Sequence, residues 1–233
     1  MTIHPLESLS RDEVTNAVDL FRSHHKNRKS FFSSIGLQEP KKSDVLGKKT
    51  IPRVIELTGV DEEQDGGFVA LIDVTGSKVL SSTRLPLDTQ VAYNYADLGL
   101  AVLLTKSNAQ WLESVAARGI DVSTEDALAL IQIDPWPAGG YAHDSIPAGH
   151  RALRCIAFLK EDPTDNGYAR PIHGLIAHVD LTAGVVTHVE DSGIIPMPTA
   201  SGRYDCESPR AIRSDLKPLS ITQPEGTSFK VVG

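Results

Sequence analysis

Residues 71–79 read Leu-Ile-Asp-Val-Thr-Gly-Ser-Lys-Val, and residues 178–186 read His-Val-Asp-Leu-Thr-Ala-Gly-Val-Val. Both stretches contain an apolar strand, an Asp-(Val/Leu)-Thr triplet, a short turn with a glycine, and a further strand rich in valine. Glycine supplies the positive φ that a tight hairpin needs. The sequence therefore predicts the same β-hairpin twice, although chance remains an alternative explanation for a match this short.

A helix is expected before each hairpin. Ser10 and Glu13 have the spacing of a capping box, which predicts a first helix from this point. A second helix is expected from Tyr95. Residues 107–110 have the same spacing and predict a restart of the helix, which should end at Gly119.

Strands are expected near residues 128–133, 151–159 and 175–181, because these stretches are rich in apolar residues and the last one alternates with period two. A helix followed by an antiparallel meander, repeated once, predicts two small α+β domains. We place the boundary between them in residues 85–91, which include Pro86.

Composition excludes several classes of partner. The net charge of −7 argues against binding to nucleic acid or to an anionic membrane. No apolar run approaches the ~20 residues needed to span a bilayer, and the first residues lack the pattern of a secretory signal, so an intracellular location is expected. The two cysteines, Cys155 and Cys206, form neither a disulfide framework nor a zinc spacing.

Two loops are expected to present aromatic side chains. Residues 134–141, Asp-Pro-Trp-Pro-Ala-Gly-Gly-Tyr, predict a stiff turn that holds Trp136 and Tyr141 on a fixed backbone. Tyr168 precedes a strand in a second loop. Each aromatic ring could pack on the edge of the core, or it could form the wall of a ligand channel.

The histidines show no known pattern of metal ligands. His24 and His25 are adjacent, so on a helix their side chains diverge by about 100° and cannot share one metal ion. His178 and His188 lie on strands that could pair, which leaves a cross-strand metal site as a minor alternative. The sequence contains no complete catalytic signature, and we predict no catalytic or metal-binding residue in it.

Several short motifs resemble one enzyme family. They are Asp-Pro-Trp at 134–136, Tyr-Ala-Arg-Pro-Ile-His-Gly-Leu at 168–175, Val-Glu-Asp at 189–191, Lys-Pro-Leu at 217–219 and Ile-Thr-Gln-Pro-Glu-Gly at 221–226. In this order and spacing they resemble the N-terminal N2 and N3 domains of copper-containing (topaquinone) primary amine oxidases.

The resemblance implies an α+β fold of two small cystatin-like domains, each a helix packed on an antiparallel sheet, followed by an extended C-terminal strip. We expect an N2-like domain at 1–88, an N3-like domain at 89–195, and a linker at 196–233 that leads toward a catalytic β-sandwich domain missing from this chain. Apolar residues of the linker would then pack on that partner.

The resemblance also implies a function for the full-length polypeptide. Enzymes of the family are homodimers that convert a primary amine, oxygen and water to an aldehyde, ammonia and hydrogen peroxide. They use copper, held by three histidines, and topaquinone, made from a tyrosine. We find neither motif here, so this chain alone should bind no cofactor and have no activity. The expected compartment is cytoplasmic or peroxisomal.

Residues that match Asp134, Pro135, Trp136 and Tyr168 line the substrate channel in the family. The resemblance therefore implies that these four residues help to select the amine. The alternative is a stand-alone cystatin-like module that binds another protein and has no enzymatic activity. A long apolar strip at 196–233 favours the first hypothesis.

Overall fold

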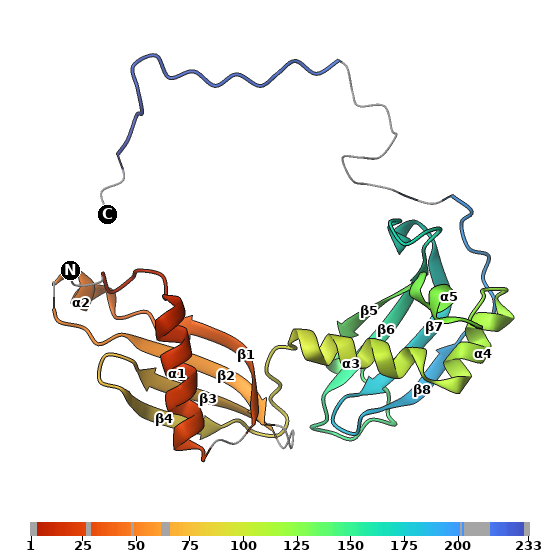
Figure 1. Cartoon of the computed structure of the whole chain (residues 1–233), viewed down its shortest axis with the longest axis horizontal. Coiled ribbons are helices and arrows are strands. Elements are labelled where there is room, and N and C mark those ends of the chain that lie inside the picture. Colours follow the sequence, from red (N-terminus) through yellow and green to blue (C-terminus); the bar gives the residue numbers. More distant parts are fainter. Residues whose placement is uncertain are drawn as a thin grey trace. The chain divides into compact units, whose positions relative to one another are not determined.

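The computed structural model describes residues 4–26, 29–47, 49–61, 66–200, 202 and 215–230. The chain divides into two units, residues 1–202 and residues 203–233. The first unit contains two antiparallel sheets of four strands, with helices beside each (Figure 1). The predicted α+β fold is thereby confirmed.

The first sheet has the strand order β1-β2-β3-β4, with every neighbouring pair antiparallel. Its elements are α1 (Arg11–His24), β1 (Ser30–Leu37), α2 (Lys42–Leu46), β2 (Val54–Asp61), β3 (Gly67–Asp73) and β4 (Lys78–Arg84). Helix α1 starts with the predicted capping box of Ser10 and Glu13. It crosses one face of the sheet and buries Ala17 and Phe21 against β2 and β3 (Figure 1).

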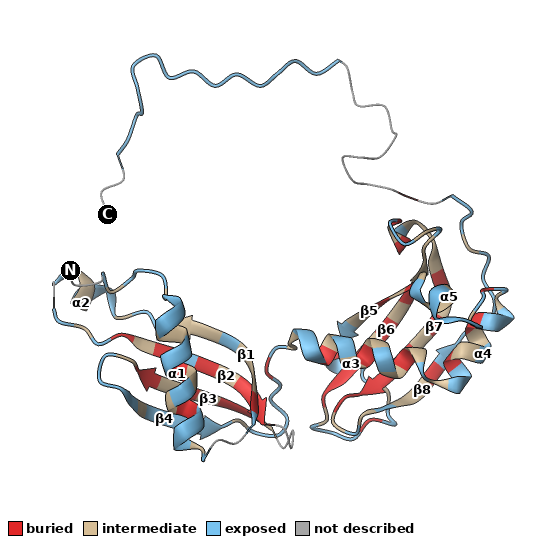
Figure 2. Cartoon of the chain, viewed as in Figure 1, coloured by how far each residue is buried: buried red, intermediate tan, exposed pale blue. Residues whose placement is uncertain are grey.

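The second sheet repeats this order as β5-β6-β7-β8. Its elements are α3 (Tyr95–Lys106), α4 (Ala109–Ala117), α5 (Glu125–Ala129), β5 (Ile131–Pro137), β6 (Ala152–Leu159), β7 (Pro171–Asp180) and β8 (Val185–Asp191). Helices α3 and α4 contribute Ala101, Trp111 and Val115 to a core shared with the sheet. Figure 2 shows that the buried residues concentrate on the strands and on the helix faces turned toward them.

The two hairpins identified in the sequence occupy equivalent positions, β3–β4 and β7–β8. In each, the threonine of the triplet accepts a hydrogen bond from the backbone N–H of an arginine near the start of another strand. Thr75 accepts from Arg53 and Thr182 accepts from Arg151, both at 3.0 Å. The repeat is therefore a repeat of structure and not a chance similarity of sequence.

The same two arginines tie each hairpin to its helix. The guanidinium of Arg53 donates to the carboxylate of Glu13, and that of Arg151 donates to the carboxylate of Asp97 at 2.7 Å. Both acids also complete the capping box at the start of their helices, α1 and α3. One side chain thus fixes the helix start, the hairpin and a strand start in each half.

The turns of the two hairpins differ from the prediction in one respect. Gly184 has φ of +69°, as expected, but in the first hairpin the positive φ, +50°, belongs to Ser77. Gly76 is needed for a different reason, because a Cβ at that position would lie 2.7 Å from Oδ2 of Asp73. The backbone N–H of Gly76 donates to the same carboxylate at 2.8 Å.

Two predicted boundaries are wrong for local reasons. The strand expected at 128–133 begins only at residue 131, because Thr124 caps a short helix, α5, that includes residues 128 and 129. The restart of the helix is capped by Asn108 rather than Ser107, with the side chain of Asn108 accepting from the N–H of Trp111.

In the second unit the structure describes residues 215–230. They form no helix or strand, and their apolar side chains are exposed, as the prediction of an extended strip required. These side chains are Leu216, Leu219, Ile221 and Phe229. Cys206 lies outside the described residues. None of the helices in the described ranges is long and apolar enough to cross a membrane.

Candidate functional site

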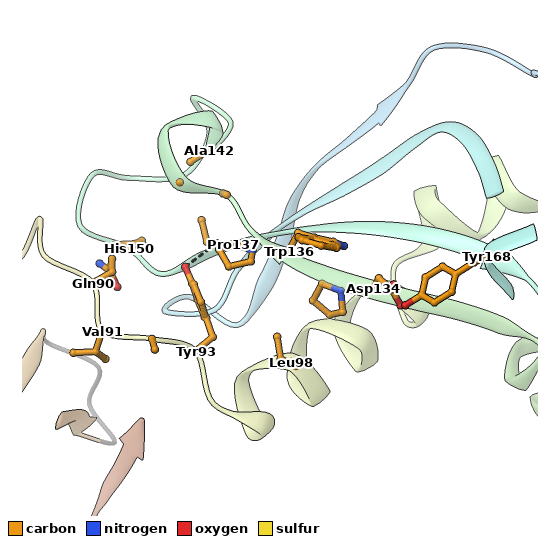
Figure 3. A pocket seen from close by; sticks show the side chains of 15 residues that line it. Gln90, Val91, Tyr93, Leu98, Asp134, Trp136, Pro137, Ala142, His150 and Tyr168 are labelled. Carbon is orange, nitrogen blue, oxygen red and sulfur yellow. Dashed lines mark hydrogen bonds between the residues drawn. The ribbon is translucent and has the colours of Figure 1, made fainter. Parts of the chain in front are cut away.

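A pocket of about 830 Å³ lies beside the edge strand β5 of the second sheet (Figure 3). All four residues that the resemblance singled out line it: Asp134, Pro135, Trp136 and Tyr168. The rest of the lining comes from the segment before α3, from α3 itself, from the end of β5, from the start of β6 and from the loop between these two strands. These residues are Gln90, Val91, Ala92, Tyr93, Leu98, Pro137, Ala138, Gly139, Ala142, His150 and Ala152.

Trp136 belongs to a strand and not to the predicted turn. Residues 134–137 are the end of β5, and they pair with β6 through residue 137. Two prolines fit here because β5 is an edge strand, where a missing backbone N–H costs no ladder hydrogen bond. The ring of Trp136 is 59% exposed, so it contributes a free aromatic surface to the pocket.

Tyr168 is positioned by a tight 3-10 turn at residues 167–169. The side chain of Asn166 accepts from the N–H of Tyr168 at 2.9 Å. Gly167 allows the turn to approach β6, because a Cβ there would lie 2.9 Å from Cβ of Phe158. The ring of Tyr168 then packs edge-on against Phe158, with 5.0 Å between centroids, and is 56% exposed.

Asp134 is the acidic side chain of the pocket. It accepts from the side-chain amide of Gln132 at 3.1 Å. Figure 3 shows the hydroxyl end of Tyr168 turned toward Asp134. Hydrogen bonding to Asp134 raises the pKa of Tyr168, so the phenol stays protonated and neutral. The arrangement combines a carboxylate with two exposed aromatic rings, which suits an organic cation.

The opposite wall of the pocket is held by buried polar contacts. Tyr93 donates from its hydroxyl to the carbonyl of Ala152 at 2.9 Å, which Figure 3 marks with a dashed line. The guanidinium of Arg151 lies 4.5 Å from the centroid of the Tyr93 ring and donates to the carbonyl of Val91 at 3.1 Å. Burial raises the pKa of Tyr93. His150 contacts Asp180 through Nδ1 at 2.7 Å.

Sequence reasoning did not identify Tyr93, Leu98 or His150 as part of the site. Tyr93 directly precedes Asn94, the capping residue of α3. Its place beside β6 therefore depends on the contact that ties the start of α3 to the start of β6, which is the ion pair between Asp97 and Arg151. These residues lie 54 positions apart in the chain. No local pattern carries that information.

The side chains that the structure describes form no site that fits copper. Among the described residues, no three histidine, cysteine, aspartate or glutamate side chains are arranged to hold a metal ion. His178 and His188 do pair across β7 and β8, as the sequence suggested they could. However, His143 stacks face to face on His188 with 3.9 Å between centroids, an arrangement in which two rings cannot both direct a lone pair at one ion. We assign no cofactor to these residues.

Comparisons with known proteins give a consistent result, although no family model matches the sequence. The chain is 33% identical to a primary amine oxidase of Arthrobacter sp. (strain P1) over 99% of its own length and 35% of the relative. It is 32% identical to a peroxisomal copper-containing diamine oxidase 1 of Nicotiana tabacum, over 77% of this chain and 22% of that one. The chain thus spans about a third or less of these relatives.

A solved structure shows the same fold. The chain matches a copper-containing benzylamine oxidase from Hansenula polymorpha with a TM-score of 0.73 and 16% identity, over 98% of this chain and 38% of that one. The two four-stranded sheets correspond to the N-terminal domains of such enzymes. Over nearly its whole length, this chain therefore belongs to the copper-containing amine oxidase family.

Proposed function

We propose that this chain forms the non-catalytic N2 and N3 domains of a copper- and topaquinone-dependent primary amine oxidase, and that its pocket forms part of the channel through which the amine enters. The N2-like domain is residues 1–88 and the N3-like domain is residues 89–195. Residues 196–233 lead to the catalytic domain. Copper and topaquinone belong to that domain, which pairs as a homodimer.

The observation that supports this proposal best is the convergence of Asp134, Pro135, Trp136 and Tyr168 on one pocket. The exposed faces of Trp136 and Tyr168 would contact the body of the amine or its ammonium group, and Asp134 adds a negative charge beside Tyr168. These side chains would bind and orient the substrate. They would leave the chemistry to residues elsewhere in the full-length protein.

The test is a change in substrate preference of the full-length enzyme. Aromatic–aromatic contacts, which benzylamine can make and methylamine cannot, contribute about 0.5–1 kcal/mol each at exposed sites, the lower part of their range, so the variant with both Trp136→Ala and Tyr168→Ala should lose about 1–2 kcal/mol of selectivity. This corresponds to a change of about 5- to 30-fold in the ratio of kcat/KM for benzylamine to that for methylamine. Copper content and quinone absorbance should stay at the wild-type level.

A matched control is Tyr95→Ala, which removes an aromatic ring that is 91% exposed and does not line the pocket. It should leave the preference ratio unchanged. If the double variant also leaves the ratio unchanged, the proposed channel role is refuted. Loss of copper or quinone in the double variant would instead indicate a role in assembly of the active site.

The continuation of the chain can be tested separately by the intact mass of the native protein. A mass far above 25.2 kDa is expected, with the catalytic domain following residue 233. A mass of 25.2 kDa would favour the alternative, a stand-alone cystatin-like module that binds another protein. We place the full-length enzyme in the cytoplasm or the peroxisome, the latter being the compartment in the name of the tobacco relative.

A further inference from the structure

The second sheet has an outer face, which is turned away from the core that it shares with α3 and α4. Leu153 and Cys155 of β6 belong to that core. Because successive side chains of a strand point to opposite faces, Arg154 and Ile156 lie on the outer face. His178 of β7, the direct partner of Arg154, lies there too.

A row of four side chains crosses the outer face, one from each strand. Trp136 pairs with Arg154, Arg154 pairs with His178, and His178 pairs with His188. Trp136 is 59% exposed, whereas Arg154 is half-buried and the side chain of His178 is 5% exposed. A cation therefore stands in the middle of this face, partly withdrawn from water.

The guanidinium of Arg154 is unusual in having no partner. Two other arginines of this half, both buried, are paired, Arg118 with Asp191 at 2.6 Å and Arg151 with Asp97 at 2.7 Å. Arg154 makes no side-chain hydrogen bond or ion pair with any residue that the structure describes, and its Nε is buried. Withdrawing a charge from water without an opposite charge is costly. The geometry therefore lacks an acid at this position.

The acids on the same face are engaged elsewhere. Asp134 accepts from the side-chain amide of Gln132 at 3.1 Å and is hydrogen-bonded to Tyr168. Glu190 contacts Nε2 of His178 at 3.3 Å. Burial lowers the pKa of His178, and the positive charge of Arg154 acts in the same direction. The charge of Arg154 is thus felt by its neighbour and is not neutralised by the acids of this face.

The surroundings of Arg154 indicate what kind of partner fits. Ile156 and Ile176 pair directly beside it and are half-buried, and the exposed ring of Trp136 lies on its other side. A small anion in water would neutralise Arg154 but would leave these apolar groups uncovered. A protein surface that presents one carboxylate among apolar side chains would match both features.

We propose that the outer face of the second sheet docks on the catalytic domain of the same polypeptide, where Arg154 pairs with a carboxylate of that domain. This inference rests on the proposed function, because it requires the continuing polypeptide. The chain covers only 35% of its relative from Arthrobacter, so most of such a polypeptide is available as the partner. Trp136 belongs both to this face and to the pocket lining, so the docked domain would complete the pocket on that side.

Pulse proteolysis in urea tests the docking when it is applied both to the 233-residue chain and to the full-length enzyme. Mass spectrometry of the fragments gives the urea midpoint at which residues 89–195 become cleavable. In the 233-residue chain, Arg154→Met should leave this midpoint unchanged or raise it, because it removes a half-buried charge that has no partner there. In the full-length enzyme the same substitution strands a buried carboxylate, so the midpoint should fall by at least about 1 M.

Two further variants control for lost packing. Arg118→Met removes a guanidinium that is already paired within this chain, so it should lower the midpoint in both proteins. Arg154→Lys keeps the charge and should lie between Arg154→Met and the wild type in the full-length enzyme. The docking is overturned if Arg154→Met lowers the midpoint equally in both proteins, if it changes neither, or if Arg154→Lys is no better than Arg154→Met.

A free carboxylate ligand is the other occupant that Arg154 could take. Sodium acetate, compared with sodium chloride at the same concentration, probes this in the 233-residue chain. Suppose that acetate raises the midpoint of the wild type but not of Arg154→Met, and that Arg154→Met has no effect in the full-length enzyme. This combination would overturn the docking in favour of a small-molecule site.

The docking and the channel role can fail separately. If Arg154→Met acts alike in both proteins while substitution of Trp136 and Tyr168 changes the substrate preference, the docking is wrong and the channel stands. If the midpoint falls only in the full-length enzyme while the preference is unchanged, the docking stands and the channel role is wrong. A native mass of 25.2 kDa would overturn both.

Discussion

Replacement of Arg151 by methionine should selectively destabilise the second half of the molecule. The substitution keeps a long apolar side chain but removes a guanidinium that is 3% exposed. Its loss leaves the carboxylate of Asp97, 8% exposed, without its cationic partner. It also removes the hydrogen bond to the carbonyl of Val91 and the contact with the ring of Tyr93.

The magnitude follows from these contacts. Breaking a buried ion pair by removing one partner costs about 3–5 kcal/mol. The lower end applies here, because Asp97 still accepts from the N–H of Asn94 at 3.0 Å and because Nε of Arg151 already lacks a partner among the described residues. With an m-value of about 2 kcal/mol/M in urea, a loss of about 3 kcal/mol lowers the unfolding midpoint by about 1.5 M.

Tryptophan fluorescence is the appropriate assay, because both tryptophans of the chain, Trp111 and Trp136, lie in the second half. Trp111 is fully buried and Trp136 is 59% exposed, so the change in emission on unfolding reports chiefly on Trp111 and the second core. Arg53→Met, the equivalent substitution in the first half, is the control and should leave this transition in place. A shift below about 0.5 M for Arg151→Met would refute the reasoning, since it would mean that the buried pair contributes little.

Two further predictions concern single side chains. Burial raises the pKa of the Cys155 thiol to about 11, so only about one thiol in a thousand is ionised at pH 8. A Cys206→Ser variant, which keeps Cys155 as its single thiol, should therefore react with an aromatic disulfide reagent only after unfolding in guanidinium. Rapid reaction of the folded protein would contradict this. Hydrogen bonds from Arg118 hold the pKa of Asp191 well below its ordinary value, so this carboxylate stabilises the fold above about pH 4 and less as the pH falls further. The free energy of unfolding of Asp191→Asn should accordingly be lower than that of the wild type at pH 7, and the difference should be smaller at pH 2.5. A difference that is the same at both pH values would show that the charge is not responsible.

Local chemistry made much of this fold predictable. The capping box of Ser10 and Glu13 located the start of α1, and period-two alternation located β7. The repeated Asp-(Val/Leu)-Thr triplet identified both hairpins, because the aspartate binds the turn and the threonine binds the neighbouring strand within a few residues or across one pairing.

The rest depended on contacts between residues far apart in the chain. The partner of Asp97 is Arg151, so the segment that supplies Tyr93 to the pocket could not be placed from the sequence around it. The stacking of His143 on two strands of the sheet was equally hidden, because nothing near His143 indicates β7 or β8. Trp136 and Tyr168 were singled out by the family resemblance, and the structure then brought them to one pocket.

The free edge of the second sheet, on β5, carries prolines at positions 135 and 137. A strand from another molecule that approached this edge would find two backbone positions without an N–H to donate, and so could not extend the sheet along it. This edge is therefore protected against aggregation by strand addition. The same two prolines flank Trp136, so strand addition is blocked at the rim of the pocket as well.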